Sequence, residues 1–265
     1  MIIKIGSNQK EHVQEIQEAL GIWIDGNFGT KTEKAVKQFQ KDNGLDVDGI
    51  VGPKTYEALM HENHKYTLDQ IQEAVKSKGY KWFENGDYNF NLVGVRSPDK
   101  DGKITNKYDD YITLSYKING EWKFHCWPST TQPGLYWINH PMNRRGCAIL
   151  VPDQYNGVYK IDGHGKTRYK ALCQRAGKVR VYRDGNKDDV YDYDNDTITE
   201  GYYGINIHRS SAYKVANNIN KYSAVCQVFK DPDDFDDMME LAYEAKDVHG
   251  NSFTYTLLNS TDINS

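Results

Sequence analysis

A histidine and a cysteine near the end of this 265-residue chain are the residues best suited to covalent chemistry. Cys226 follows His208 by 18 residues. A cysteine attacks a carbonyl only as its thiolate, so a thiol with an ordinary pKa of about 8.5 needs a nearby base or cation. We therefore predict that Cys226 is the nucleophile and that His208, on a neighbouring strand, is its general base.

The residues around this pair receive supporting roles. We assign catalytic roles to Arg209, whose neighbourhood supplies a backbone carbonyl that orients the imidazole, and to Ser223, three residues before the cysteine. Backbone N–H groups of Val225 and Ala224 are predicted to stabilise the oxyanion, since losing one such donor costs about 10²–10³ in rate. Substrate contacts are predicted at His164, Asn206 and Gln227.

The pattern around the cysteine resembles the L,D-transpeptidase family, whose signature is a His, a gap and then Ser-His-Gly-Cys. This chain reads Ser-Ala-Val-Cys over residues 223–226, so the second His and the Gly are replaced. Upstream, Pro133-Gly134 lies in a segment similar to the family's Thr-Pro-x-Gly strand. The resemblance spans residues 88–258 and implies a divergent, phage-associated cysteine catalytic domain.

An internal repeat occupies the first sixty residues. The pattern Asp-Gly-x-x-Gly-x-x-Thr-x-x-Ala begins at Asp25 and again at Asp48, an offset of 23 residues. Apolar residues at helical spacing between these turns predict a compact three-helix unit. The pattern resembles the peptidoglycan-binding domain found beside many cell-wall enzymes. Trp23 and Tyr56 are either ligand contacts or core residues.

After the repeat, the sequence pattern changes to one that predicts a helix and then short strands, and these elements must position the predicted site. Thr67 and Gln70 form a capping box that starts a helix, and Gly79 ends it. Short apolar alternations then predict strands, with a two-residue hairpin turn at Asn119-Gly120. A helix begins after Asp231-Pro232. The strands are expected at residues 91–95, 111–116, 179–182, 204–207 and 253–258.

We therefore expect an α+β protein: a small three-helix wall-binding domain at residues 1–62, a connecting helix within residues 63–79, and a β-rich L,D-transpeptidase-like catalytic domain at residues 80–265. The net charge of −4 and the scattered Lys and Arg residues make nucleic acid a poor partner. No segment approaches the apolar length of a membrane span, and the chain opens without an export signal.

Cofactors and metals are not expected. The four cysteines lack CxxC spacing, and reduced thiols are the default in a chain without a signal peptide. The acidic loop at residues 184–196 favours a solvated turn, because it lacks the glycine and the glutamate of a calcium loop. The sequence leaves calcium binding by this loop open.

Three functions fit these observations. The first is an endolysin-like cysteine peptidase that degrades bacterial peptidoglycan, a monomer made in the host cytoplasm that acts at the wall or periplasm. The second is an L,D-transpeptidase that forms cross-links. The third is a non-catalytic wall-binding virion component, which Ala224 and Val225 favour.

Overall fold

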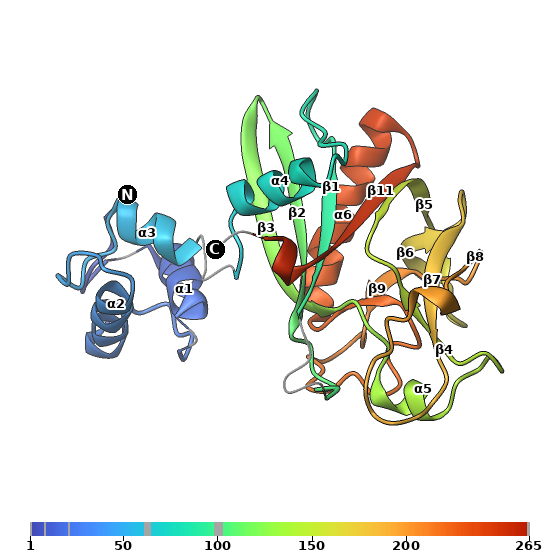
Figure 1. The fold of residues 1–265 in the computed structure, drawn as a ribbon. Coiled ribbons are helices and arrows are strands. Elements are labelled where there is room, and N and C mark those ends of the chain that lie inside the picture. The colour runs from blue at the N-terminus through green and yellow to red at the C-terminus, as the bar shows by residue number, and fades with distance from the viewer. Residues whose placement is uncertain (1, 8, 21, 61–64, 98–102, 264–265) are drawn as a thin grey trace. The chain divides into compact units, whose positions relative to one another are not determined.

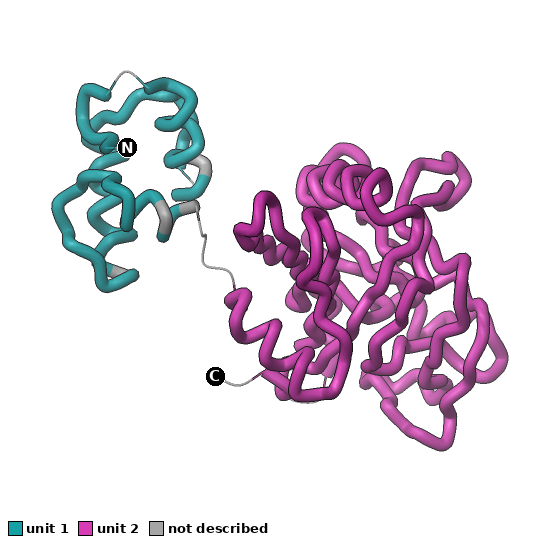
Figure 2. The backbone as a smooth tube through the Cα atoms, turned by 90° about the horizontal axis from the view of Figure 1, so that it is seen from above, with its two compact units in different colours: residues 1–64 teal, residues 65–265 magenta. Residues whose placement is uncertain are grey.

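The computed structural model describes residues 2–7, 9–20, 22–60, 65–97 and 103–263. The chain divides into two compact units, residues 1–64 and 65–265 (Figure 2). The first unit is helical and the second contains an eight-stranded barrel, which confirms the α+β class (Figure 1). The domain boundary expected at residue 62 lies outside the described residues.

Three helices form the first unit: α1 (Lys10–Ala19), α2 (Thr30–Asp42) and α3 (Pro53–Met60). Their spacing places one apolar face of each helix inward, as the sequence predicts. The turn glycines Gly26 and Gly49 adopt positive φ, which glycine does at little cost. The core of this unit consists of Ile3, Val13, Ile16, Phe28, Val36, Val51 and Leu59.

Two buried glutamines that the sequence analysis did not identify hold the repeated turns. Gln17 lies in α1 and Gln40 in α2, and both are almost completely buried. Each side-chain amide donates to an aspartate and a threonine and accepts from the turn glycine, at 2.7–3.2 Å. The partners are Asp25, Gly26 and Thr32 for Gln17, and Asp48, Gly49 and Thr55 for Gln40.

The second unit begins with α4 (Leu68–Ser77), where Thr67 and Gln70 form the predicted capping box. The helix packs Ile71, Ala74 and Val75 against apolar side chains of the barrel strands. Its buried face therefore covers one outer side of the barrel (Figure 1).

The barrel closes through eight strands, of which β1/β11 and β9/β10 pair in parallel and the other neighbours antiparallel. In spatial order the strands are β1 (Asn91–Arg96), β11 (Phe253–Asn259), β5 (Gln154–His164), β6 (Tyr169–Gln174), β9 (Ile207–Arg209), β10 (Gln227–Phe229), β3 (Glu121–Thr130) and β2 (Asp110–Ile118).

The β2–β3 connection is the hairpin that the sequence predicts. Asn119 has φ of 53° and Gly120 has φ of 83°, and positive φ at both central residues defines the type I′ turn that matches strand twist. Ile118 pairs with Glu121 directly across this turn. The local sequence therefore sets the register of the longest strand pair.

The strand expected at residues 204–207 begins later, at Ile207. The reason is a side chain: Gln174 Oε1 accepts hydrogen bonds from the backbone N–H groups of Tyr203, Gly204 and Ile205 at 2.9–3.2 Å. These donors are consequently not available to a strand ladder. Gln174 thus holds a loop where the alternating pattern indicated a strand.

A smaller sheet, two α-helices and two short 3₁₀-helices (η1 and η2) complete the described part of the second unit. The sheet contains β4 (Cys147–Leu150), β7 (Val179–Asp184) and β8 (Thr199–Gly201), with β7 in the centre. The helix predicted after Asp231 is α6 (Pro232–His249), whose buried side chains join the barrel core. The remaining elements are α5 (Leu135–Asn139), η1 (Asn195–Thr197) and η2 (Ser260–Asp262). No described helix is long and apolar enough to span a bilayer.

Candidate active site

The parallel pair β9/β10 brings the predicted nucleophile and base to adjacent strands. Val228 pairs with His208 and Gln227 with Ile207, so the same register aligns Cys226 with Asn206. Cys226 and Asn206 lie just before these two strands, and His208 lies within β9. The pairing therefore brings the cysteine and the histidine to neighbouring segments of the backbone.

The Cys226 thiol is held by backbone groups. The N–H of Asn206 donates to Sγ at 3.4 Å, and the thiol donates to the carbonyl oxygen of Gly204 at 3.6 Å. Burial raises the pKa of Cys226 to about 11, although the Asn206 N–H opposes the shift. No hydrogen bond among the described residues joins this thiol to the His208 ring. The thiol is therefore protonated at neutral pH in this structure.

The His208 ring has a defined tautomer. Its Nδ1 lies 2.8 Å from the carbonyl oxygen of Arg209, the residue assigned to this neighbourhood from the sequence. Because a carbonyl only accepts, Nδ1 carries the proton and Nε2 carries the free lone pair. The pKa of His208 is lowered to about 3, mainly because the ring is buried and to a smaller extent because His164 lies next to it. The ring is thus a neutral imidazole with an unprotonated Nε2.

His164, which lies at the end of β5, stacks on His208 with ring centroids 4.2 Å apart. Its Nδ1 lies 2.9 Å from Asn206 Nδ2. The Asn206 amide orientation is determined because its Oδ1 accepts from the N–H of Gln174 at 2.9 Å. Asn206 Nδ2 is therefore the donor, so His164 Nδ1 accepts and its proton is on Nε2. Burial lowers the pKa of His164 as well.

Ser223 shapes the loop in front of the cysteine and does not face the thiol. Its buried Oγ donates to the carbonyl oxygen of Cys226 at 2.7 Å, and its own carbonyl accepts from the N–H of Gly134 at 2.9 Å. A Cβ at Gly134 would lie 2.1 Å from the Asn220 carbonyl oxygen, so only glycine allows this approach. The Pro133-Gly134 segment and the cysteine loop therefore pack directly together.

Gln227 and Arg209 have positions that the sequence did not reveal. Gln227 is fully buried, where Tyr255 donates to its Oε1 at 2.8 Å and its Nε2 donates to the Val225 carbonyl at 3.3 Å. The substrate contact predicted for Gln227 is not available in this structure, because the residue after Cys226 faces the barrel interior. Arg209 pairs with Asp236 at 2.9 Å and lies over Tyr169.

A cleft adjoins the loop before Cys226. Ala224 and Val225 line it, and no hydrogen bond among the described residues takes up the backbone N–H of either. Cys147 also lines the cleft, with its Sγ 3.5 Å from the Ala224 carbonyl oxygen. Burial raises the pKa of Cys147 to about 12. None of the four cysteines, all of which lie among the described residues, forms a disulfide.

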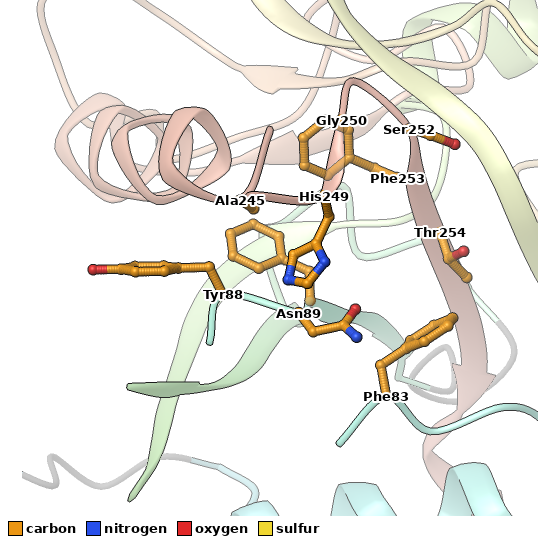
Figure 3. A pocket seen from close by; sticks show the side chains of 10 residues that line it. Phe83, Tyr88, Asn89, Ala245, His249, Gly250, Ser252, Phe253 and Thr254 are labelled. Carbon is orange, nitrogen blue, oxygen red and sulfur yellow. The ribbon is translucent and has the colours of Figure 1, made fainter. Parts of the chain in front are cut away.

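A separate pocket lies between the end of α6 and residues 83–90 (Figure 3). It is lined by aromatic side chains such as Tyr88 and Phe253, and by His249, whose Nε2 lies 2.8 Å from the Asp87 carbonyl oxygen. None of the site residues predicted from the sequence lines this pocket. Within the described residues, no group of three or more His, Cys, Asp or Glu side chains could hold a metal ion.

Comparisons with known proteins identify the first unit. Residues 9–59 match a protein-family model described as "Putative peptidoglycan binding domain", so the chain carries a peptidoglycan-binding domain. No curated protein sequence matches the chain. One matching solved structure is a fused Zn-dependent amidase/peptidase/peptidoglycan-binding domain-containing protein from Clostridium acetobutylicum ATCC 824. It is 14% identical over 97% of this chain and 99% of that chain, with a TM-score of 0.25.

Proposed function

We propose that the second unit is a cysteine peptidase that hydrolyses stem peptides or cross-links of bacterial peptidoglycan, in the manner of an endolysin. The observation that carries the proposal is that Cys226 directly precedes β10, the strand that pairs with His208 on β9, beside a cleft lined by Ala224 and Val225. The peptidoglycan-binding domain supplies the substrate class, because it would hold the second unit near the wall.

His208 is suited to the role of base because its Nε2 is unprotonated. The Arg209 carbonyl fixes the proton on Nδ1, and the stacked His164 ring disfavours a charged imidazolium. The resting pair is a neutral thiol and a neutral imidazole, so the proton transfer accompanies the attack instead of preceding it. Substrate must displace the thiol from Gly204 for Sγ to reach both the carbonyl and the base.

The reaction then follows acyl-enzyme chemistry. Cys226 Sγ bonds to the carbonyl carbon while its proton moves to His208 Nε2, and the unpaired N–H groups of Ala224 and Val225 donate to the oxyanion. The C–N bond breaks and the proton on Nε2 passes to the leaving amine. Water attacks the thioester with His208 again as base, which releases a carboxylate and restores the thiol.

His164 and Asn206 complete the proposed site. Asn206 fixes the His164 tautomer with its proton on Nε2, and His164 is half-exposed whereas His208 is buried. A neutral imidazole with an N–H donor can hold a substrate carbonyl. His164 is therefore the proposed substrate contact, and Asn206 is the residue that orients it.

Replacement of Cys226 by Ala tests the proposal, with Cys126→Ala, at a buried cysteine that does not line the cleft, as the matched control. We expect Cys226→Ala to release no stem fragments from purified peptidoglycan, as measured by mass spectrometry, and Cys126→Ala to release them at the wild-type rate. New cross-links in the wild-type digest would indicate an L,D-transpeptidase. Unchanged walls with the wild-type protein would indicate a binding component, and activity in Cys226→Ala would refute this nucleophile.

A further inference from the structure

The cleft beside Ala224 and Val225 contains a positively charged side chain. Its lining includes the aromatic residues Trp137 and Tyr203, and among the described residues Arg183 is the only charged one that lines it. Arg183 comes from the central strand β7 of the small sheet. A guanidinium therefore lies in the same cleft as the proposed oxyanion donors.

Uncharged residues hold the Arg183 side chain in place. Its Nε donates to Thr199 Oγ1 at 3.3 Å, and its guanidinium carbon lies 4.8 Å from the centroid of the Tyr203 ring. No carboxylate of the described residues forms an ion pair with it. By contrast Arg180, on the same strand, pairs with Asp153 at 2.7 Å. Arg183 therefore presents a positioned cation whose anion is not supplied by the described part of the chain.

A planar guanidinium that is stacked on an aromatic ring keeps its forked N–H donors in place for a carboxylate, which it can bind through two parallel hydrogen bonds. A lysine-like point charge would not impose the same geometry.

We propose that this cleft is the acyl-donor subsite and that Arg183 binds a free carboxylate of the peptide whose carbonyl Cys226 attacks. The inference rests on the proposed function and deepens it, because it selects acidic peptide stems over stems whose carboxylates are amidated. The carboxylate binds at Arg183 while the scissile carbonyl lies at the Ala224 and Val225 N–H groups, which line the same cleft.

Binding is measured in the full chain with Cys226→Ala, so that turnover does not interfere. The probes are two soluble peptide stems that differ only in one carboxylate, free or amidated. We expect the free acid to bind about 10–100-fold more tightly, the difference that a charge-assisted pair supports. Adding Arg183→Gln should abolish this preference, and Arg183→Lys should restore part of it.

Arg180→Gln in the same background is the control, since Arg180 shares the strand but does not line the cleft, and it should retain the preference. Thermal unfolding of each variant establishes that it is folded. Equal affinity for the two stems, a preference that survives Arg183→Gln, or no binding of either stem would overturn the inference. Failure of the proposed function appears separately, as peptidoglycan that wild-type protein leaves uncut.

Discussion

Replacing His208 by Gln should remove a pH-dependent part of the stability of the second unit. Glutamine is neutral at all pH values and can still donate to the Arg209 carbonyl. The folded pKa of His208 is about 3, against 6.5 for an ordinary histidine. Because the folded pKa is the lower one, the stabilising contribution is present above pH 6.5 and is lost as pH falls toward 3.

The size of the effect follows from the same two values. Each pKa unit corresponds to about 1.4 kcal/mol, so the wild-type chain should lose about 2 kcal/mol at pH 5 and at most about 5 kcal/mol near pH 3, relative to the variant. Other acidic and basic groups titrate in both proteins, so their contributions cancel in the difference between the two.

Urea unfolding at pH 7.5, 6, 5 and 4 measures this difference. Tryptophan fluorescence is a suitable probe, because four of the five tryptophans lie within residues 65–265. We expect the free-energy difference between wild type and His208→Gln to shrink or reverse as pH falls. Parallel pH profiles for the two proteins would show that His208 titrates normally, and the description of a buried, permanently neutral base would then be wrong.

Three further predictions address other parts of the chain. Gln40→Ala should destabilise the first unit by about 2–4 kcal/mol, because it leaves the buried Gly49 N–H without its acceptor. Thermal unfolding measures this loss, and an unchanged unfolding temperature of the first unit would contradict it. Ser223→Ala should cost about 1–3 kcal/mol and lower turnover by displacing the cysteine loop, to be checked by calorimetry and by fragment release. Trp23 is 84% exposed and contributes little to folding, so Trp23→Ala should keep the wild-type unfolding temperature. The same variant should sediment with purified peptidoglycan about tenfold less than wild type, and equal sedimentation would assign wall binding to other residues.

Trp23 also illustrates a question that the amino-acid sequence left open. Both Trp23 and Tyr56 could have been contacts or core, and the structure exposes Trp23 while Tyr56 packs against the core and donates to Glu15 at 3.0 Å. Solvent exposure depends on which neighbours cover a side chain, and the aromatic type alone does not determine it.

Features governed by neighbouring residues were predictable from sequence. The Thr67 capping box, the Asn119-Gly120 turn and the α6 start at Asp231 each depend on dihedral preferences and hydrogen bonds within four residues. The 23-residue repeat likewise predicted the three helices of the first unit.

The arrangement around the thiol was decided only by tertiary structure. His164 contacts His208 from β5, Asn206 is oriented by Gln174 of β6, and Arg183 reaches the cleft from a second sheet. These partners are far apart along the chain, and barrel closure and strand order bring them together. The residue types in the sequence therefore indicated a cysteine and a base, whereas the histidine tautomers and the burial of both groups follow from long-range pairing that no local pattern encodes.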